Sequence, residues 1–77
     1  MPLYYVNIVR KDAKTLDLEG VNLRDDAAAM KYALADAVDL IAQGILDQDS
    51  IKHYHLEVVD GTGRMVTMIS LKDVAGR

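Results

Sequence analysis

Two histidines and a glutamate, His53, His55 and Glu57, are the residues of this chain best suited to chemistry. In a β-strand, side chains two positions apart emerge on the same face, so these three would form a row. Imidazole and carboxylate groups are ligands that zinc and nickel accept, which makes a metal-binding protein one hypothesis. Polar side chains on the outer face of a sheet show the same spacing and are far more common. We therefore assign no metal ligand and no cofactor to the chain.

Two other motifs resemble ligand-binding loops but lack essential members. Asp47 and Asp49 begin like a calcium-binding loop, yet Lys52 stands where that loop requires glycine and Val58 where it requires glutamate. The Gly-Thr-Gly segment 61–63 resembles a phosphate-binding turn, but a predicted strand follows it instead of a helix N-terminus. We interpret the first motif as a solvated loop and the second as a hairpin turn.

Hydrolytic catalysis has few candidate residues in this chain. Ser50 and Ser70 are its serines, and neither lies in the sequence context of a nucleophile. A pair formed by His55 and Asp17 across the sheet would lie on an open surface, without a pocket to exclude water. Cysteine nucleophiles are excluded because the chain contains no cysteine. We predict that the protein is not an enzyme.

Length and composition bound the class of protein. The chain has 77 residues, of which 51% are hydrophobic and 27% charged, and we place a single domain at 1–77. Its apolar runs are too short to cross a membrane, and its first residues lack the pattern of a signal peptide. Together with the lack of cysteine, this composition favours a cytoplasmic protein.

Hydrophobic periodicity predicts two strands, one helix and two more strands. Alternation of apolar and polar residues indicates the strands, and apolar residues three or four positions apart indicate the helix. We expect an α+β fold, in which a four-stranded, mostly antiparallel sheet carries one amphipathic helix on one face. Strand order 2-1-3-4 makes every neighbouring pair antiparallel, and order 1-2-3-4 is the alternative. The predicted elements are strands 3–10 and 15–23, helix 25–46, and strands 53–59 and 65–71.

The predicted helix has an apolar face and an acidic face. Asp25 is its expected N-cap, and Gly44 marks a last turn that frays, bends or extends beyond the sheet. Asp36 and Asp39 form a ridge on the outer face, which solubility explains and which would alternatively dock a basic protein partner. Tyr32 on that face either packs against a neighbouring side chain or is available to a second molecule. The residues expected to face the core are Met30, Ala33, Leu34, Ala37, Ile41 and Ile45.

One helix can cover only one face of four strands, so the other face should remain open. The residues expected there, with Asn7 and Leu71 among them, are more apolar than a small monomer usually exposes. We therefore predict a small interaction module without catalytic activity, a homo-oligomer with a dimer favoured, which associates through the open face or an edge strand. The residues predicted at its interface are Tyr5, Val9, Val59, Met65, Thr67, Ile69 and, from the outer helix face, Tyr32.

Positive charge gathers at one place in the predicted fold. If the strands alternate in direction, Lys11, Lys14, Lys52 and Lys72 lie at one end of the domain, near the C-terminus of the helix. A regulatory protein of the antitoxin type, with a role linked to nucleic acid, would need a basic stripe of this kind. The net charge of −3 argues against nucleic-acid binding, so this role is an alternative to the interaction module.

Residues spread over nearly the whole chain form a combination known from other proteins. They are Met1, Pro2, Tyr4 and Tyr5, then Asp17, Glu19, Gly20, Val21 and Leu23, then Ala28, Ala33 and Ala37, and finally Val58, Asp60, Gly63, Arg64, Leu71 and Asp73. With these residues, the chain resembles a family of short bacterial proteins classed as a domain of unknown function. Leu71 departs from the pattern, because an aromatic residue is common there. The resemblance implies a stand-alone ββαββ domain and supplies no activity, ligand or catalytic residue.

Overall fold

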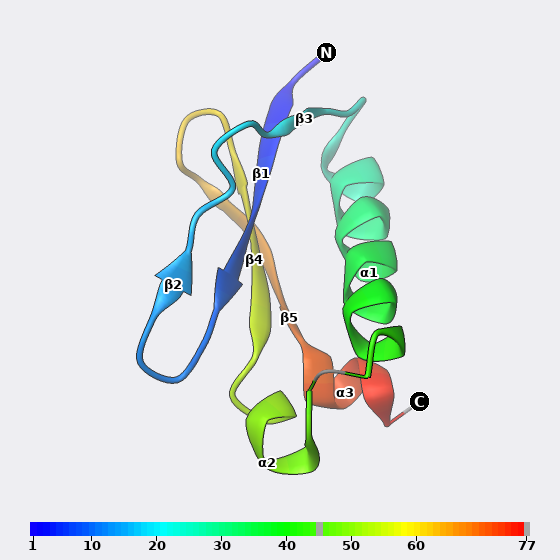
Figure 1. Cartoon of the computed structure of the whole chain (residues 1–77). Helices are drawn as coiled ribbons and strands as arrows, with labels where there is room; N and C mark the ends of the chain where they lie inside the picture. Colours follow the sequence, from blue (N-terminus) through cyan, green and yellow to red (C-terminus); the bar gives the residue numbers. More distant parts are fainter. Residues whose placement is uncertain (45, 77) are drawn as a thin grey trace.

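One long helix packs on one face of a small antiparallel sheet (Figure 1), which confirms the predicted α+β fold class. The computed structural model describes residues 1–44 and 46–76. Two short helices that the sequence pattern did not indicate complete the described part of the chain. The elements are β1 (Leu3–Val9), β2 (Lys14–Thr15), β3 (Val21–Asn22), α1 (Asp26–Ala42), α2 (Gln48–Ile51), β4 (His55–Asp60), β5 (Met65–Ser70) and α3 (Leu71–Ala75).

Within the described residues, the sheet has five strands, and every pair of neighbours is antiparallel. β1 and β4 lie at its centre and β5 at one edge, so the order is β2-β1-β4-β5. β3 pairs with the start of β1, where Leu3 lies opposite Asn22. The predicted order 2-1-3-4 is confirmed, except that the predicted second strand is split into β2 and β3.

The side chain of Asp17 causes this split. Its carboxylate accepts the backbone N–H of Val6 at 3.2 Å, in place of a neighbouring strand's carbonyl. It also accepts the N–H groups of Glu19 and Gly20 at 3.2 and 3.1 Å, while the N–H of Asp17 donates to Asn7 Oδ1 at 2.9 Å. Because these four backbone N–H groups find side-chain partners, the chain can leave the sheet between β2 and β3 without losing their hydrogen bonds.

α1 begins where the sequence predicts and ends earlier. The Asp25 carboxylate accepts the N–H of Ala28 at 2.9 Å, which is the expected N-cap interaction. The helix ends at Ala42 because Gly44 adopts a φ of +70°, the left-handed conformation with which glycine commonly terminates helices. Ile45, which the sequence places on the core-facing side, lies outside the described residues.

A stripe of small side chains packs α1 against the sheet. Ala29, Ala33 and Ala37 are fully buried, whereas Met30 is about half exposed. Alanines four positions apart lie on one side of the helix and let its backbone approach the strands closely. The predicted core face is therefore confirmed at Ala33 and Ala37 and wrong at Met30. The core has two clusters of buried residues, which are Tyr4, Ala29, Ala33 and Val58 in one and Ala37, Leu56 and Leu71 in the other.

Rows of paired residues across β1, β4 and β5 define the two faces of the sheet, because directly opposed residues point the same way. One face lies under α1, and we call the other the open face, although Lys14, Asp17 and Gly20 of the segment between β1 and α1 cover part of it. The rows under α1 are Val6–Val58–Thr67 and Ile8–Leu56–Ile69, and the rows on the open face are Tyr5–Val59–Met65, Asn7–Glu57–Met68 and Val9–His55–Ser70.

A β-bulge in the pairing of β4 with β5 decides which residues of β5 face α1. Val66 is left without an opposed residue, so the alternation shifts by one position at this point. Ile69 packs against both core clusters, and Thr67 lies in a row under α1. The predicted placement of Thr67 and Ile69 on the open face is therefore wrong, and Met68 lies there instead.

Two short helices replace segments that the sequence predicts as loop and strand. Asp47 Oδ1 accepts the N–H of Ser50 at 2.7 Å and caps α2, within the predicted loop 47–52. Ser70 Oγ accepts the N–H of Asp73 at 3.4 Å and caps α3, which ends the last strand. Leu71, predicted on the open face, is instead fully buried in the core, because the chain turns into α3 at this residue.

Candidate interaction surface

A hydrogen-bonded polar group occupies the centre of the open face. Asn7 and Glu57 lie opposite each other there and are only 5% and 8% exposed. Asn7 Nδ2 donates to Glu57 Oε1 at 3.0 Å, and Lys14 Nζ lies 2.7 Å from the same oxygen. The hydrogen bond from Lys14, followed by that from Asn7, lowers the pKa of Glu57. Glu57 is therefore held as a carboxylate in a structural role.

The three candidate metal ligands are not arranged as a binding site. His53 lies in the turn after α2, His55 is the first residue of β4, and Glu57 is engaged by Lys14 and Asn7. Over the part of the chain that the structure describes, no group of three or more His, Cys, Asp or Glu side chains could hold a metal ion.

Apolar side chains flank this polar centre. Tyr5, Val59 and Met65 form a row across three strands on one side of it, and Val9 lies opposite His55 on the other. Among the four apolar residues, Met65 is exposed and the others are partly buried. The structure thus brings four of the seven predicted interface residues to the open face.

β5 is the edge strand on the side of the sheet away from β2. Its sequence contains no charged residue and no proline, although edge strands commonly use both to prevent pairing with other chains. Met65 and Met68, which point to the open face, are 51% and 43% exposed. A groove of about 410 Å³ lies between β5 and α1, and its lining includes Met30, Leu34 and Val74. An uncharged strand edge is suited to accept a further strand.

Tyr32 places an aromatic ring on the exposed side of α1. It is 41% exposed and lies beside Ala28 and Ala35. α1 packs on the opposite side of the sheet from the open face (Figure 1). The structure therefore does not join Tyr32 to the predicted interface residues of the strands.

The acidic residues of α1 differ in their surroundings. Asp39 is exposed, whereas Asp36 is half-buried, and both line a groove of about 300 Å³ whose floor includes Ile8 of β1. Burial, followed by the charges of Asp39 and Asp17, raises the pKa of Asp36. The prediction of a solvent-facing ridge is therefore correct for Asp39 and wrong for Asp36, which faces the edge of β1.

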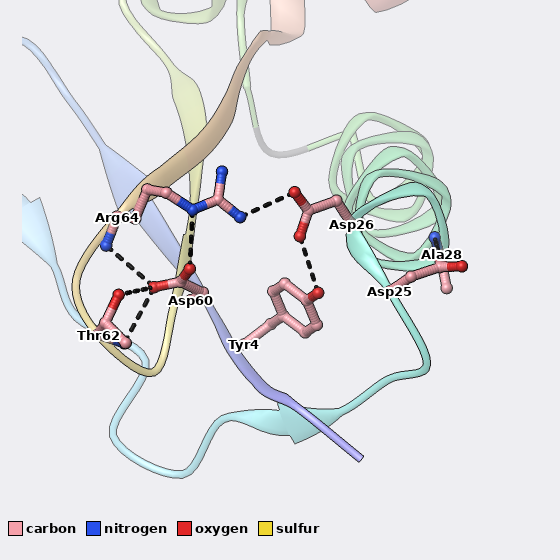
Figure 2. Close-up of polar contacts among 7 residues, drawn as sticks. All are labelled: Tyr4, Asp25, Asp26, Ala28, Asp60, Thr62 and Arg64. Carbon is pink, nitrogen blue, oxygen red and sulfur yellow. Dashed lines mark hydrogen bonds and ion pairs between the residues drawn. The ribbon is translucent and has the colours of Figure 1, made fainter.

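A second polar network joins the β4–β5 hairpin to the N-terminus of α1 (Figure 2). Arg64 donates from Nη2 to Asp26 at 2.8 Å and from Nε to Asp60 at 3.0 Å. The Tyr4 hydroxyl donates to the other oxygen of Asp26 at 2.8 Å. Asp60 Oδ1 accepts the N–H and O–H of Thr62 at 2.9 and 2.7 Å and the N–H of Arg64 at 3.0 Å. Asp60 and Arg64, which carry part of the family resemblance, therefore hold the hairpin against the helix.

These hydrogen bonds change the acidity of the network's members. The Thr62 hydroxyl, together with backbone N–H groups and Arg64, lowers the pKa of Asp60 from 3.8 to about 2. Arg64, followed by Tyr4, lowers the pKa of Asp26. Burial, followed by the hydrogen bond to Asp26, raises the pKa of Tyr4. The folded state therefore favours both carboxylates in their ionised form.

We expect the thermal stability of the protein to fall in acid because of this network. A carboxylate whose pKa is depressed on folding contributes stability above its unfolded pKa, and that stability is lost as the pH falls through the folded pKa. For Asp60 this window extends from 3.8 to about 2. Asp60→Asn should lower the Tm at neutral pH and make the acid loss smaller, which circular dichroism melts between about pH 7 and pH 2 would measure. An equal acid loss in wild type and Asp60→Asn would contradict the assignment.

Comparisons with known proteins identify a family. No curated protein and no solved structure matched the chain. Among the helices of the described residues, none has both the length and the apolar character needed to cross a membrane. A family model described as "Domain of unknown function (DUF6894)" matches residues 3–72, a range that includes β1 to β5 and α1. The resemblance seen in the sequence is confirmed, and the chain belongs to this family of domains of unknown function.

Proposed function

We propose that this protein is a non-catalytic interaction module that self-associates through the edge of β5. The observation that carries the proposal is an uncharged edge strand, β5, which itself contains two half-exposed methionines, Met65 and Met68. Pairing with another strand would satisfy the outward-pointing backbone groups of β5 and cover part of both side chains. Both backbone hydrogen bonds and burial of apolar surface would therefore favour association.

The polar centre of the open face favours the edge over the face as the contact. Asn7 and Glu57 already satisfy each other and are nearly buried, so covering them would release little apolar surface from water. Covering Lys14 would also remove water from a charge that is about half exposed. The exposed apolar side chains of the sheet lie at β5 instead.

A second copy of the chain is the partner that β5 fits best. A two-fold axis perpendicular to the sheet allows the strand to pair antiparallel with its own copy. The end of β5 that carries Arg64 then lies beside the end of the second copy that carries Asp73. Arg64 is already paired with Asp26 and Asp60, and Lys72 lies next to Asp73, so the fit of the second copy rests on the backbone of β5 and not on these charges.

The surroundings of the candidate catalytic groups support a function without catalysis. The Asp17 carboxylate is engaged by three backbone N–H groups, so His55 gains no acid partner from it. Ser70 accepts the N–H of Asp73 at the start of α3 and thereby has a capping role. The side chains of Asp17 and Ser70 therefore each have a structural role, which is to hydrogen-bond nearby backbone N–H groups.

Light scattering after size-exclusion chromatography tests the proposal over a range of micromolar concentrations. We expect a mass twice that of the 8.5 kDa monomer. Met68→Lys introduces the charge that natural edge strands use against pairing, and it should weaken association by at least about tenfold. Tyr32→Lys is the matched control, because Tyr32 and Met68 are 41% and 43% exposed and Tyr32 lies outside the groove beside β5.

A wild-type chain that keeps the monomer mass at every concentration contradicts self-association. Dissociation by Tyr32→Lys but not by Met68→Lys would place the contact on the outer side of α1 and overturn the role of β5. Circular dichroism melts of both variants establish that each remains folded, so that a loss of mass reports on the interface alone.

A further inference from the structure

A pocket of about 500 Å³ is lined by the β1–β2 turn and by the segment around α2. These two segments lie at the same end of the domain (Figure 1). The turn contributes residues 10–13 to its lining, and the segment 49–54 contributes the remaining lining residues. This volume is within the range of small-molecule binding sites. The pocket is formed by two segments far apart in the sequence, and neither belongs to β5.

Basic side chains from both segments surround the pocket. Arg10 and Lys11 come from the turn, and Lys52 and His53 come from the chain after α2. Arg10 is held in place because its Nη2 donates to Thr15 Oγ1 at 3.0 Å. The pocket lining therefore contains a guanidinium from one segment and an ammonium from the other, which together suit an anion.

Two acidic residues, Asp12 and Asp49, also line the pocket, so its three cationic side chains leave it one net positive charge. Asp49 is 97% exposed, and its carboxylate is 4.0 Å from Lys52 Nζ, so this long ion pair in water contributes little. Asp12 is also exposed. Of the lysines predicted at this end, Lys14 is engaged by Glu57 and is not part of the pocket lining. A locally positive concave surface thus exists on a chain whose net charge is −3.

We propose that this pocket binds a small phosphomonoester of nucleotide size. The phosphate dianion lies between Arg10 and Lys52, where charge-assisted hydrogen bonds can reach it from both segments. Ala13 and Tyr54 supply apolar lining for the rest of the ligand. Binding does not depend on self-association, because the pocket contains no residue of β5.

Adenosine monophosphate is the probe that tests the proposal, titrated into isotope-labelled protein while NMR records the amide chemical shifts. We expect saturable shifts confined to residues 10–13 and 49–54. Lys52→Ala should weaken binding by about tenfold, the effect of losing one charge-assisted contact. Lys72→Ala is the matched control, because it removes the same charge from α3, outside the pocket, and it should leave the affinity unchanged.

Three results would overturn the proposal. The first is the lack of any saturable shift in these two segments. The second is equal weakening by Lys52→Ala and Lys72→Ala, which would show that only overall charge attracts the nucleotide. The third is equally tight binding of adenosine, because a site that recognises the phosphate must discriminate against the uncharged nucleoside.

Discussion

Replacement of Ala37 by aspartate is expected to unfold the domain. Ala37 is fully buried where α1 meets the sheet, and it packs with Leu56 and Leu71. The alanine stripe brings the helix too close to the strands to admit a carboxylate, which would be buried without a partner. Burial of an unpaired charge costs more than about 4 kcal/mol, whereas a domain of this size has a total stability on the order of 4 to 12 kcal/mol. Circular dichroism at 25 °C should therefore show loss of the cooperative melt.

Ala35→Asp is the control for this variant. Ala35 lies two positions away in the same helix and is exposed, so the same substitution has the same helix propensity without burying the charge. It should change the free energy of unfolding by less than about 1 kcal/mol, as measured by urea denaturation. If Ala37→Asp melts like Ala35→Asp, the described packing of α1 on the sheet is incorrect.

Gly20→Ala should be the most destabilising of the glycine substitutions in the described turns. Gly20 has a φ of +74°, and a Cβ there would lie 2.9 Å from the Tyr5 ring, 3.0 Å from Leu3 Cδ1 and 3.0 Å from the backbone oxygen of Tyr4. The left-handed conformation costs about 1–2 kcal/mol for a residue with a side chain. The contact with a backbone atom, which cannot move aside cheaply, adds about 1–3 kcal/mol. Urea denaturation should thus show a loss of about 2–5 kcal/mol.

Gly44→Ala separates these two contributions. Gly44 has nearly the same φ, +70°, but a Cβ there would meet no heavy atom within 4 Å. The free energy of unfolding should therefore fall only by the cost of the left-handed conformation, about 1–2 kcal/mol. Equal losses at Gly20 and Gly44 would mean that the loop over Tyr5 yields freely and that the Asp17 interactions do not fix it.

Local signals made the fold class readable from the sequence. Tyr4, Val6 and Ile8 alternate with residues that point to the other face of the strand. This alternation follows from the pleated backbone itself, so it indicates a strand even when the partner strand is unknown. Asp25 and the Asp60–Gly63 turn act on backbone groups within four residues, so their effects follow from the sequence alone. The strand order followed from the preference for antiparallel neighbours.

The parts that could not be read from the sequence depend on contacts between distant residues. Asn7 and Glu57 are 50 positions apart, and nothing local indicates that they bond across the sheet. The bulge that turns Met68 to the open face arises from the pairing of β4 with β5 and leaves no mark in an apolar run.

Ser70 and Asp73 did offer a signal, because a serine followed three residues later by an acid often begins a helix.

The divided strand opposite β5 also sets a limit on how many copies can join. β2 and β3 are two residues long each, and between them the Asp17 carboxylate takes the place that an incoming chain's carbonyl would need at Val6. In the described part of the sheet, the edge formed by β2 and β3 offers no continuous run of free backbone N–H and C=O groups with which a further strand could pair. If two copies pair at β5 as proposed, each uses the edge of the described sheet that can accept a strand. Assembly would then stop at a dimer, because the Asp17 carboxylate would block strand pairing at the opposite edge of each copy.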